Sequence, residues 1–528
     1  MKRNVKILSA LLSCLLCLTT LVGCMAQNAP DAMIGGDQNN AAMAPSGGYF
    51  DGNSNVVGSD DSLSDWMGTE NEDYTEIVEN SFVNAAETPD SYFSVDANTA
   101  AYPNLRSLIR RGLSIPKDAV RVEEMLNYFS YDYQTPAEGA IFALNASMFD
   151  TPYNAKTKLL TIGLAAQEVE FESVQNNLVF LIDVSGSMYS SDKLPLVQAA
   201  FMMLTENLNP GDRISIVTYA SGDSVALEGA HGDEKQKIMA VIEDLQAGGS
   251  TAGSKGIERA YELATRYFIE GGNNRVILAT DGDFNVGVTG TDALEKLIAQ
   301  KRESGVYFSV IGVGRGNLKS DKMETLALKG NGTYHYIDSV KEAKRALVEQ
   351  IGGSMVTVAK DVKAGVTFNP EYVESYRLIG YENKLLTEDQ FNDESTDAGE
   401  IGSGHTVTVV YEIKLTDKAL VEGENIAQVK LRYKPTENST GDTETKESVL
   451  DVGTSVYHPE CTDTDSFVAA VVEFALILRQ SEYRGEATLE ALIARLKQLD
   501  VANDEFRQEF VELVGTYYEN CDQEQEMN

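Results

Sequence analysis

The sequence contains few of the residues that most often carry catalysis or bind soft metals. Its 528 residues include five cysteines, four histidines and one tryptophan. No Cys/His zinc pattern, His-Glu-x-x-His motif, Walker loop or Gly-x-Ser-x-Gly elbow occurs. The histidines are scattered among predicted loops and strands, at positions His231, His335, His405 and His458. We therefore expect a protein that is not an enzyme.

Basic residues are also scarce. The chain has 43 lysines and arginines against 81 aspartates and glutamates, and its formal net charge is −38 at pH 7. A surface of this sign repels the phosphates of nucleic acids, so we expect no nucleic-acid partner. The same charge suits a well-solvated protein and attracts divalent cations weakly. Net charge alone does not identify a binding partner, so the kind of partner has to be inferred from sequence motifs.

The first 24 residues have the organisation of a secretory signal peptide. Three basic residues precede the apolar stretch Ile7–Val22, which is too short to span a bilayer comfortably. Residues 21–24 read Leu-Val-Gly-Cys and resemble the bacterial lipobox, whose cysteine is acylated before cleavage. We predict that lipid chains on Cys24 anchor the protein to a membrane, facing outside the cytoplasm. The alternative is an ordinary signal peptide with an incidental cysteine.

Two cysteines remain beyond the signal peptide, Cys461 and Cys521. An exported protein is in a compartment that permits a disulfide between them. Their separation in sequence says nothing about their distance in space, and two thiols are equally compatible with it.

Composition and periodicity divide the rest of the chain. Residues 25–75 are dominated by Asn, Gly, Ser, Asp, Ala and Met, and they have too few branched or aromatic side chains to build a core. We predict a flexible tether there. The predicted segments are a lipoprotein signal peptide (1–24), the tether (25–75), an N-terminal subdomain that contributes strands to a flanking module (76–176), an α/β domain (177–352), a β-rich module (353–458) and a helical C-terminal region (459–528).

The α/β domain is predicted from short buried strands that alternate with amphipathic helices, which is typical of a doubly wound parallel sheet. The predicted strands are Leu178–Ile182, Arg213–Tyr219, Arg275–Ala279, Val306–Val313 and Tyr334–Ile337. The helices include Leu194–Asn207, Glu234–Leu245, Gly256–Phe268, Thr291–Ser304 and Val340–Ile351. A period of 2 then predicts an antiparallel β-sandwich-like module, and three helical stripes predict a small C-terminal cap.

An Asp-x-Ser-x-Ser pattern follows the first strand of the predicted sheet, with Asp183, Ser185 and Ser187. Alternate residues point the same way as a chain leaves a strand, so these three side chains can converge. One carboxylate and two hydroxyls are hard donors that suit Mg²⁺, with Mn²⁺ or Ca²⁺ as substitutes. By itself the pattern also fits a polar turn in which a serine caps the next helix.

Two later loops add oxygen donors at the same predicted edge. Thr251 precedes a helix, and Asp281 follows the strand Arg275–Ala279. Ligands of such sheets bind beyond the carboxyl ends of the strands. A hydroxyl from Thr251 and a carboxylate from Asp281, the latter through water, would complete five protein positions around an octahedral ion.

The order and context of these three segments resemble the metal-ion-dependent adhesion site (MIDAS) of von Willebrand factor A (VWA) domains. Ser254 stands where that family commonly has glycine, which leaves Ser250 as an alternative to Thr251. Further segments resemble YfbK-like lipoproteins over nearly the whole chain beyond the tether: 93–100, 118–129, 376–383 and 397–402. This likeness implies an architecture more than a role.

The resemblance implies binding through the metal. Asp183 and Asp281 supply only two carboxylates, so the ion keeps an open position that an Asp or Glu of a protein partner can fill. We expect a surface-tethered, metal-dependent adhesion or assembly protein. The alternative is an ion clamped internally by an acid of a flanking module in an envelope scaffold. A metal-dependent hydrolase is disfavoured, because Ser185 stands where a phosphatase needs a second acid.

Overall fold

The computed structural model describes residues 74–527 except for several short gaps, which are 96, 170–173, 221, 250–252, 283–290, 316–318, 351–354, 437–438 and 440–443. The predicted signal peptide with Cys24, and nearly all of the predicted tether, lie outside the described residues. Thr251 and Ser250 lie outside them as well.

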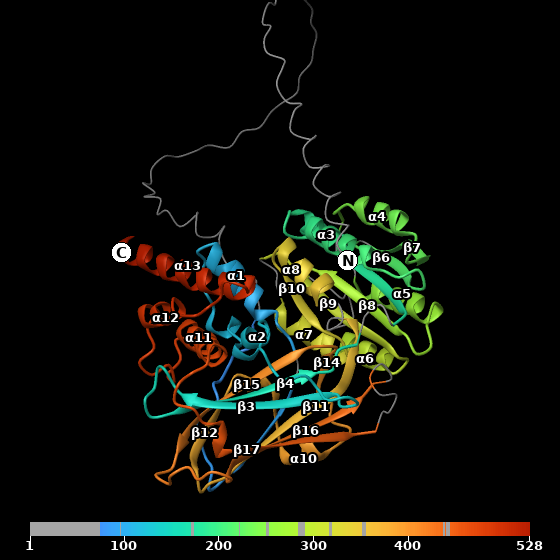
Figure 1. The fold of residues 1–528 in the computed structure, drawn as a ribbon. Coiled ribbons are helices and arrows are strands. Elements are labelled where there is room, and N and C mark those ends of the chain that lie inside the picture. The colour runs from blue at the N-terminus through green and yellow to red at the C-terminus, as the bar shows by residue number, and fades with distance from the viewer. Residues whose placement is uncertain are drawn as a thin grey trace, which may run out of the picture. The chain divides into compact units, whose positions relative to one another are not determined.

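The α/β domain contains a six-stranded sheet in the order β10-β9-β8-β5-β6-β7 (Figure 1). Five strands are parallel, and β7 pairs antiparallel with β6 at one edge. The bounds are β5 (Asn176–Asp183), β6 (Arg213–Tyr219), β7 (Asp223–His231), β8 (Asn273–Thr280), β9 (Val306–Val313) and β10 (Tyr334–Ile337). Every residue of β5 and β8 is buried, as expected of parallel strands covered on both faces.

Helices cover both faces of this sheet and form two separate apolar cores. One core is shared by α3 (Leu194–Glu206), α4 (Lys235–Glu243), α8 (Val340–Lys344) and the π-helical turn Arg345–Glu349. The other is shared by α5 (Gly253–Arg266), α6 (Thr291–Arg302) and α7 (Ser320–Lys329). The predicted doubly wound fold is confirmed. The edge strand β7 and the helix α7 were not predicted.

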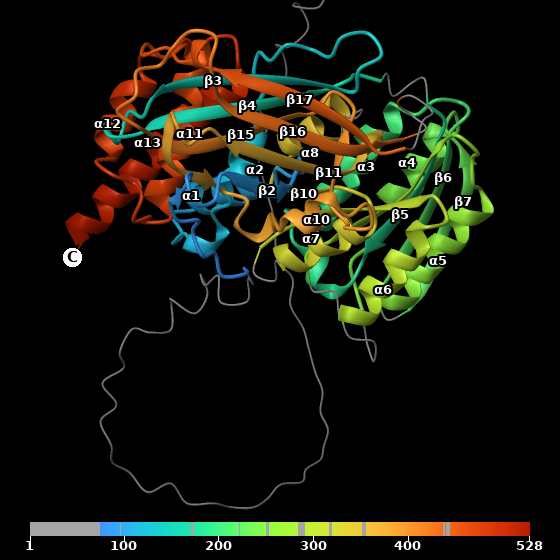
Figure 2. The same cartoon turned by 90° about the horizontal axis from the view of Figure 1, so that it is seen from below.

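The flanking module is made of two antiparallel sheets packed around one core (Figure 2). The first has the order β1-β12-β15-β4-β3, with bounds Val83–Asn84, Val373–Ile379, Thr406–Leu415, Lys158–Ala166 and Phe142–Asp150. The second has the order β13-β2-β11-β16-β17, with bounds Leu385–Leu386, Asp90–Ser94, Thr357–Phe368, Asn425–Pro435 and Lys446–Gly453, and β14 (Gly399–Gly402) pairs with β11. Strands from before and after the α/β domain therefore share both sheets.

The helical part combines both ends of the described chain. Its core joins α1 (Ala101–Arg110) and α2 (Val122–Asn127) to α11 (Asp463–Leu478), α12 (Leu489–Leu496) and α13 (Glu505–Met527). Figure 1 shows the blue α1 and α2 beside the red C-terminal helices. The predicted C-terminal cap is confirmed, and it also contains two N-terminal helices that sequence periodicity could not place there.

The α/β domain is inserted into the flanking module between β4 and β11, so both of its ends join that module. Ser403 lies between the two connections. Its backbone N–H donates to the Val356 carbonyl at 2.8 Å, and its hydroxyl contacts the backbone N and O of Val169 at 2.6 and 3.0 Å. One buried serine thus fastens the entering and the leaving chain to each other.

A buried arginine links the α/β domain to the helical part. Arg106 of α1 is 1% exposed and forms ion pairs with Asp338 at 2.5 Å, Glu342 at 2.9 Å and Glu509 at 2.6 Å. Asp338 and Glu342 belong to the α/β domain, whereas Glu509 lies on α13. Arg345 pairs with the other oxygen of Glu342 at 2.9 Å. We call this set the arginine cluster.

Candidate metal site

The Asp-x-Ser-x-Ser segment leaves the centre of the parallel sheet. The apolar run of β5 ends at Asp183, which is 0% exposed, and a 3₁₀ turn follows over Gly186–Tyr189. The backbone N–H of Ser185 donates to Asp183 Oδ1 at 2.9 Å, and this bond turns the chain back over the carboxylate. The hydroxyl oxygens of Ser185 and Ser187 lie 3.0 Å apart. The three predicted donors therefore lie together.

The neighbouring strands deliver further oxygen atoms to Asp183. Tyr219, at the end of β6, donates to Asp183 Oδ2 at 3.2 Å, and Thr280, at the end of β8, donates to the same atom at 3.1 Å. Asp281 follows Thr280 directly and is 1% exposed. The structure therefore brings Asp183, Ser185, Ser187 and Asp281 to one edge of the sheet.

The loop that leads to Thr251 is fastened to the same turn. The Gly248 N–H donates to the Val184 carbonyl at 2.7 Å, and the Gly186 N–H donates to the Gly249 carbonyl at 3.1 Å. Thr251 itself lies outside the described residues, so its role stays a prediction.

The charges at this edge suit a cation. Burial raises the pKa of Asp183 above its usual range, the hydrogen bonds from Ser185 oppose the rise, and Asp281 adds to it. Among the described residues, no lysine, arginine or histidine forms an ion pair with Asp183. Two hydroxyls and two carboxylates fit Mg²⁺, a hard ion that prefers oxygen ligands. Among the described residues, no group of three or more His, Cys, Asp or Glu side chains is arranged to hold a metal ion, so a metal at this edge would need the hydroxyl ligands as well.

Sequence reasoning missed Lys193 at this site. Its Nζ atom lies 2.7 Å from Asp281 Oδ2, and the residue is only 8% exposed. Lys193 precedes α3 and carries no motif of its own. Lys193 reaches the site because its side chain extends from the Asp-x-Ser-x-Ser loop to Asp281 at the end of β8.

One flank of the site is formed by α1 and the residue that follows it. Arg111 forms an ion pair with Asp192, next to Lys193, at 3.1 Å. Arg315, beyond the end of β9, donates to Asn104 Oδ1 at 3.0 Å. Residues 101–113 include no aspartate or glutamate. The side chains presented on this flank are therefore basic or neutral.

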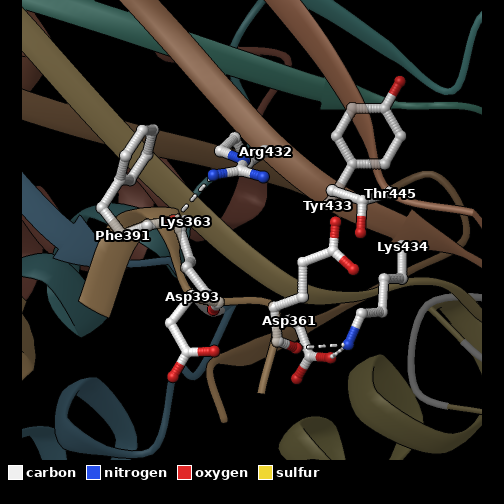
Figure 3. Close-up of a pocket in the computed structure, with 9 residues that line it drawn as sticks. Asp361, Lys363, Phe391, Asp393, Arg432, Tyr433, Lys434 and Thr445 are labelled. Carbon is white, nitrogen blue, oxygen red and sulfur yellow. Dashed lines mark hydrogen bonds and ion pairs between the residues drawn. The ribbon is translucent and has the colours of Figure 1, made fainter. Parts of the chain in front are cut away.

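A pocket lies apart from the metal edge in the flanking module, between β11, β16 and α10 (Glu388–Asn392), and charged side chains line it (Figure 3). Lys363 donates to the carbonyls of Gln390 and Asp393 at 3.2 and 2.5 Å. Lys434 pairs with Asp361 at 2.8 Å. Lys363 thereby holds the end of α10 against the sheet.

Two further observations bear on the predictions. Cys461 and Cys521 do not form a disulfide with each other. Over the stretches of chain with described coordinates, we find no helix that is both long and apolar enough to cross a membrane.

The fold and this edge define a protein built around a von Willebrand factor type A domain. The family model of that domain matches residues 177–350, and a model described as von Willebrand factor matches 68–161. A model described as the C-terminal part of the uncharacterized protein YfbK matches residues 353–519.

The chain belongs to the YfbK family. It is 37% identical over 468 residues to the uncharacterized protein YfbK of Escherichia coli (strain K12), and the match covers 84% of this chain and 80% of that protein. The predicted resemblance to VWA domains and to the YfbK family is thereby confirmed.

Other similar proteins share less sequence identity with the chain. Human inter-alpha-trypsin inhibitor heavy chain H3 is 24% identical over 278 residues, which are 48% of this chain and 30% of that protein. The solved von Willebrand factor type A structure from Catenulispora acidiphila is 17% identical, and the match covers 73% of this chain and 91% of that chain with a TM-score of 0.40. Domains of this type are commonly protein-interaction domains.

Proposed function

We propose that this protein is a lipid-tethered module that binds a protein partner through a divalent metal ion at the carboxyl edge of its parallel sheet. The observation that carries the proposal is Asp183, a fully buried carboxylate that receives hydrogen bonds but no ion pair from the described residues. Burying a charge is costly unless a cation or a metal compensates it.

The residues that would hold Mg²⁺ are Asp183, Ser185 and Ser187 directly, Asp281 through water, and Thr251 from the adjoining loop. Mn²⁺ or Ca²⁺ would serve as substitutes. A bound ion would supply an electrophilic coordination position that a carboxylate oxygen of the partner can fill.

The surroundings of the site favour an acidic partner group. The strongly negative chain places basic side chains at this edge, namely Lys193 and Arg111. Each is paired with an aspartate, so the edge would become positive only when the ion is bound, and the loaded site would then attract a carboxylate and speed its encounter. The negative charge of an Asp or Glu of the partner therefore complements both the ion and the basic side chains beside it.

The internal-clamp alternative is less well supported. It requires an acid from a flanking module at the metal edge, but the flank made by residues 101–113 contains none. The arginine cluster already ties the α/β domain to α1 and α13 without a metal. An ion is not needed to hold these parts together.

Binding also fits the chemistry better than catalysis. None of the residues assigned to the site is a histidine that could activate a nucleophile, and Ser185 stands two residues after Asp183, where a phosphatase needs a second acid. We propose that the protein acts outside the cytoplasm, where acyl chains on Cys24 attach it to a membrane and residues 25–75 space it from the surface.

The metal site is tested by replacing Asp183 with alanine. Mg²⁺ binding to the purified chain, measured by titration calorimetry, is expected to fall at least about tenfold, because the single direct carboxylate is lost. Asp192→Ala is the matched control, since this aspartate lies on the same loop but faces Arg111. Equal Mg²⁺ affinities of wild type and Asp183→Ala would contradict the proposal.

Partner binding is tested by capture from cell-envelope extracts in Mg²⁺, followed by elution with EDTA. The proposal requires a protein that is retained by wild type and Asp192→Ala, is lost with Asp183→Ala and is released on chelation. A large drop in thermal stability on chelation, with no such protein, would favour the internal clamp.

The anchor is tested by Cys24→Ser. We expect the protein to move from the membrane fraction to the soluble fraction, because a serine cannot form the thioether on which acylation depends. Metabolic labelling with a fatty-acid analogue checks the same point. Labelling that persists in the variant would show that Cys24 is not the site.

A further inference from the structure

Lys193 occupies an unusual place at the metal edge. Its Nζ atom lies 2.7 Å from Asp281 Oδ2 in a nearly buried ion pair, while Asp183 a short distance away has no such partner among the described residues. The ammonium therefore neutralises one of the two carboxylates on which the proposed ion depends.

The residue that follows β9 is a glycine, Gly314, which leaves room for the Lys193 side chain. Gly314 has a φ of +71°, and a Cβ atom placed on it would lie 2.5 Å from Lys193 Cε. Any larger residue at position 314 would collide with the lysine's methylenes and strain the backbone. The methylenes of Lys193 therefore pass directly over Gly314 on the way to Asp281.

We propose that Lys193 is an internal counter-cation that competes with the divalent ion for Asp281, an inference that rests on the proposed metal site. Before the ion binds, the carboxylates of Asp183 and Asp281 and the ammonium of Lys193 together carry one excess negative charge. After a divalent ion binds, the same site carries one excess positive charge. The lysine therefore weakens ion binding, stabilises the metal-free edge and leaves the loaded site attractive to a partner's carboxylate.

This role predicts opposite changes in two properties when the charge is removed. With Lys193→Met, Mg²⁺ is expected to bind at least about tenfold more tightly, since a like charge within a few ångströms of the ion is lost. The melting temperature in EDTA is expected to fall, and its rise on adding Mg²⁺ is expected to grow. Damage that was merely structural would lower stability without tightening Mg²⁺ binding.

The experiment is a Mg²⁺ titration of the purified full chain, in parallel with thermal melts with and without Mg²⁺. Lys193→Arg keeps the charge and is expected to bind Mg²⁺ with nearly the affinity of wild type. Lys237→Met removes an exposed lysine that pairs with Glu234 and should leave Mg²⁺ binding unchanged.

The outcomes separate this inference from the proposed function. Equal or weaker Mg²⁺ binding by Lys193→Met, with binding by wild type intact and binding by Asp183→Ala lost, would overturn the counter-cation role alone. Failure of wild type and Lys193→Met alike to bind Mg²⁺ would overturn both.

Discussion

The metal edge and the arginine cluster both bury carboxylates beyond the carboxyl ends of strands in the same sheet. Asp338 follows β10, and with Glu342 it receives the guanidinium groups of Arg106 and Arg345. Asp183 ends β5 and receives only hydrogen bonds from the described residues, from Ser185, Tyr219 and Thr280. One set is fully paired, whereas the other lacks one cation.

The difference separates a structural role from a binding role. A buried carboxylate with bidentate arginine contacts has its charge and its hydrogen bonds satisfied, so it has nothing to offer a ligand. A carboxylate surrounded by hydroxyls is oriented but not neutralised, so it can still take a cation. Burial alone would not distinguish the two sites.

The largest effect is expected from breaking the arginine cluster. Arg106→Met leaves Asp338, Glu342 and Glu509 without their shared cation, and the free energy of unfolding should fall by about 3 to 5 kcal/mol. Urea denaturation measures this. Arg266→Met, at an exposed ion pair with Glu228, is the control and should change little. A loss as small as in the control would show that the cluster does not hold the parts together.

A smaller effect is expected from acid, because a buried histidine, His335, and a partly buried one, His405, lie near the fixed positive charge of Arg345. Burial is the main cause that lowers the pKa of His405 to about 4 and the pKa of His335 to about 3, and the positive charge of Arg345 is the second cause. Both histidines bind a proton more readily in the unfolded chain, so stability is full above pH 6.5 and falls below it. Each should cost about 2 kcal/mol at pH 5.

Urea denaturation between pH 7 and pH 5 checks this expectation. His335→Gln and His405→Gln should each flatten the pH dependence of the unfolding free energy. His458→Gln is the control, because that histidine is more exposed and lies in another part of the flanking module. A pH dependence unchanged in both variants would mean that the two histidines are protonated without penalty.

The smallest effect on stability is expected at the rim of the metal edge. Arg111→Ala removes a half-exposed pair with Asp192 and should change the free energy of unfolding by less than about 0.5 kcal/mol. It should nevertheless slow association with an acidic partner, and the difference from wild type should shrink at high salt. Stopped-flow or biosensor rates measure this. An association rate equal to that of wild type would remove Arg111 from the binding surface.

Much of the fold follows from periodicity. The continuous apolar runs of β5 and β8 predicted buried parallel strands, and alternation predicted the antiparallel module to which β15 (Thr406–Leu415) belongs. Edge strand β7 was missed because most of its residues are exposed, so it has neither an apolar run nor a clear alternation. The packing of α1 and α2 against the C-terminal helices depends on contacts between residues hundreds of positions apart, which no local pattern encodes.

The site was predictable to the extent that its residues stand in one motif. Asp183, Ser185 and Ser187 are close in sequence, and strand order placed Asp281 beside them. Lys193 was not predictable, because its position depends on the backbone of Gly314 and on the end of β8. Thr280 stood next to a predicted ligand, but its bond to Asp183 required the register of β5 and β8 to be known.

The insertion of the α/β domain has a mechanical consequence. A domain on a single linker swivels freely, and any pull on it passes through one chain. Here tension between a partner on the metal edge and the proposed lipid anchor would divide between the two connections of the α/β domain. Ser403 links these connections to each other. Arg275 of β8 links the second connection to the domain by donating to the Met355 carbonyl. Such a joint resists both rotation and peeling, which suits a module that must keep hold of its partner under load.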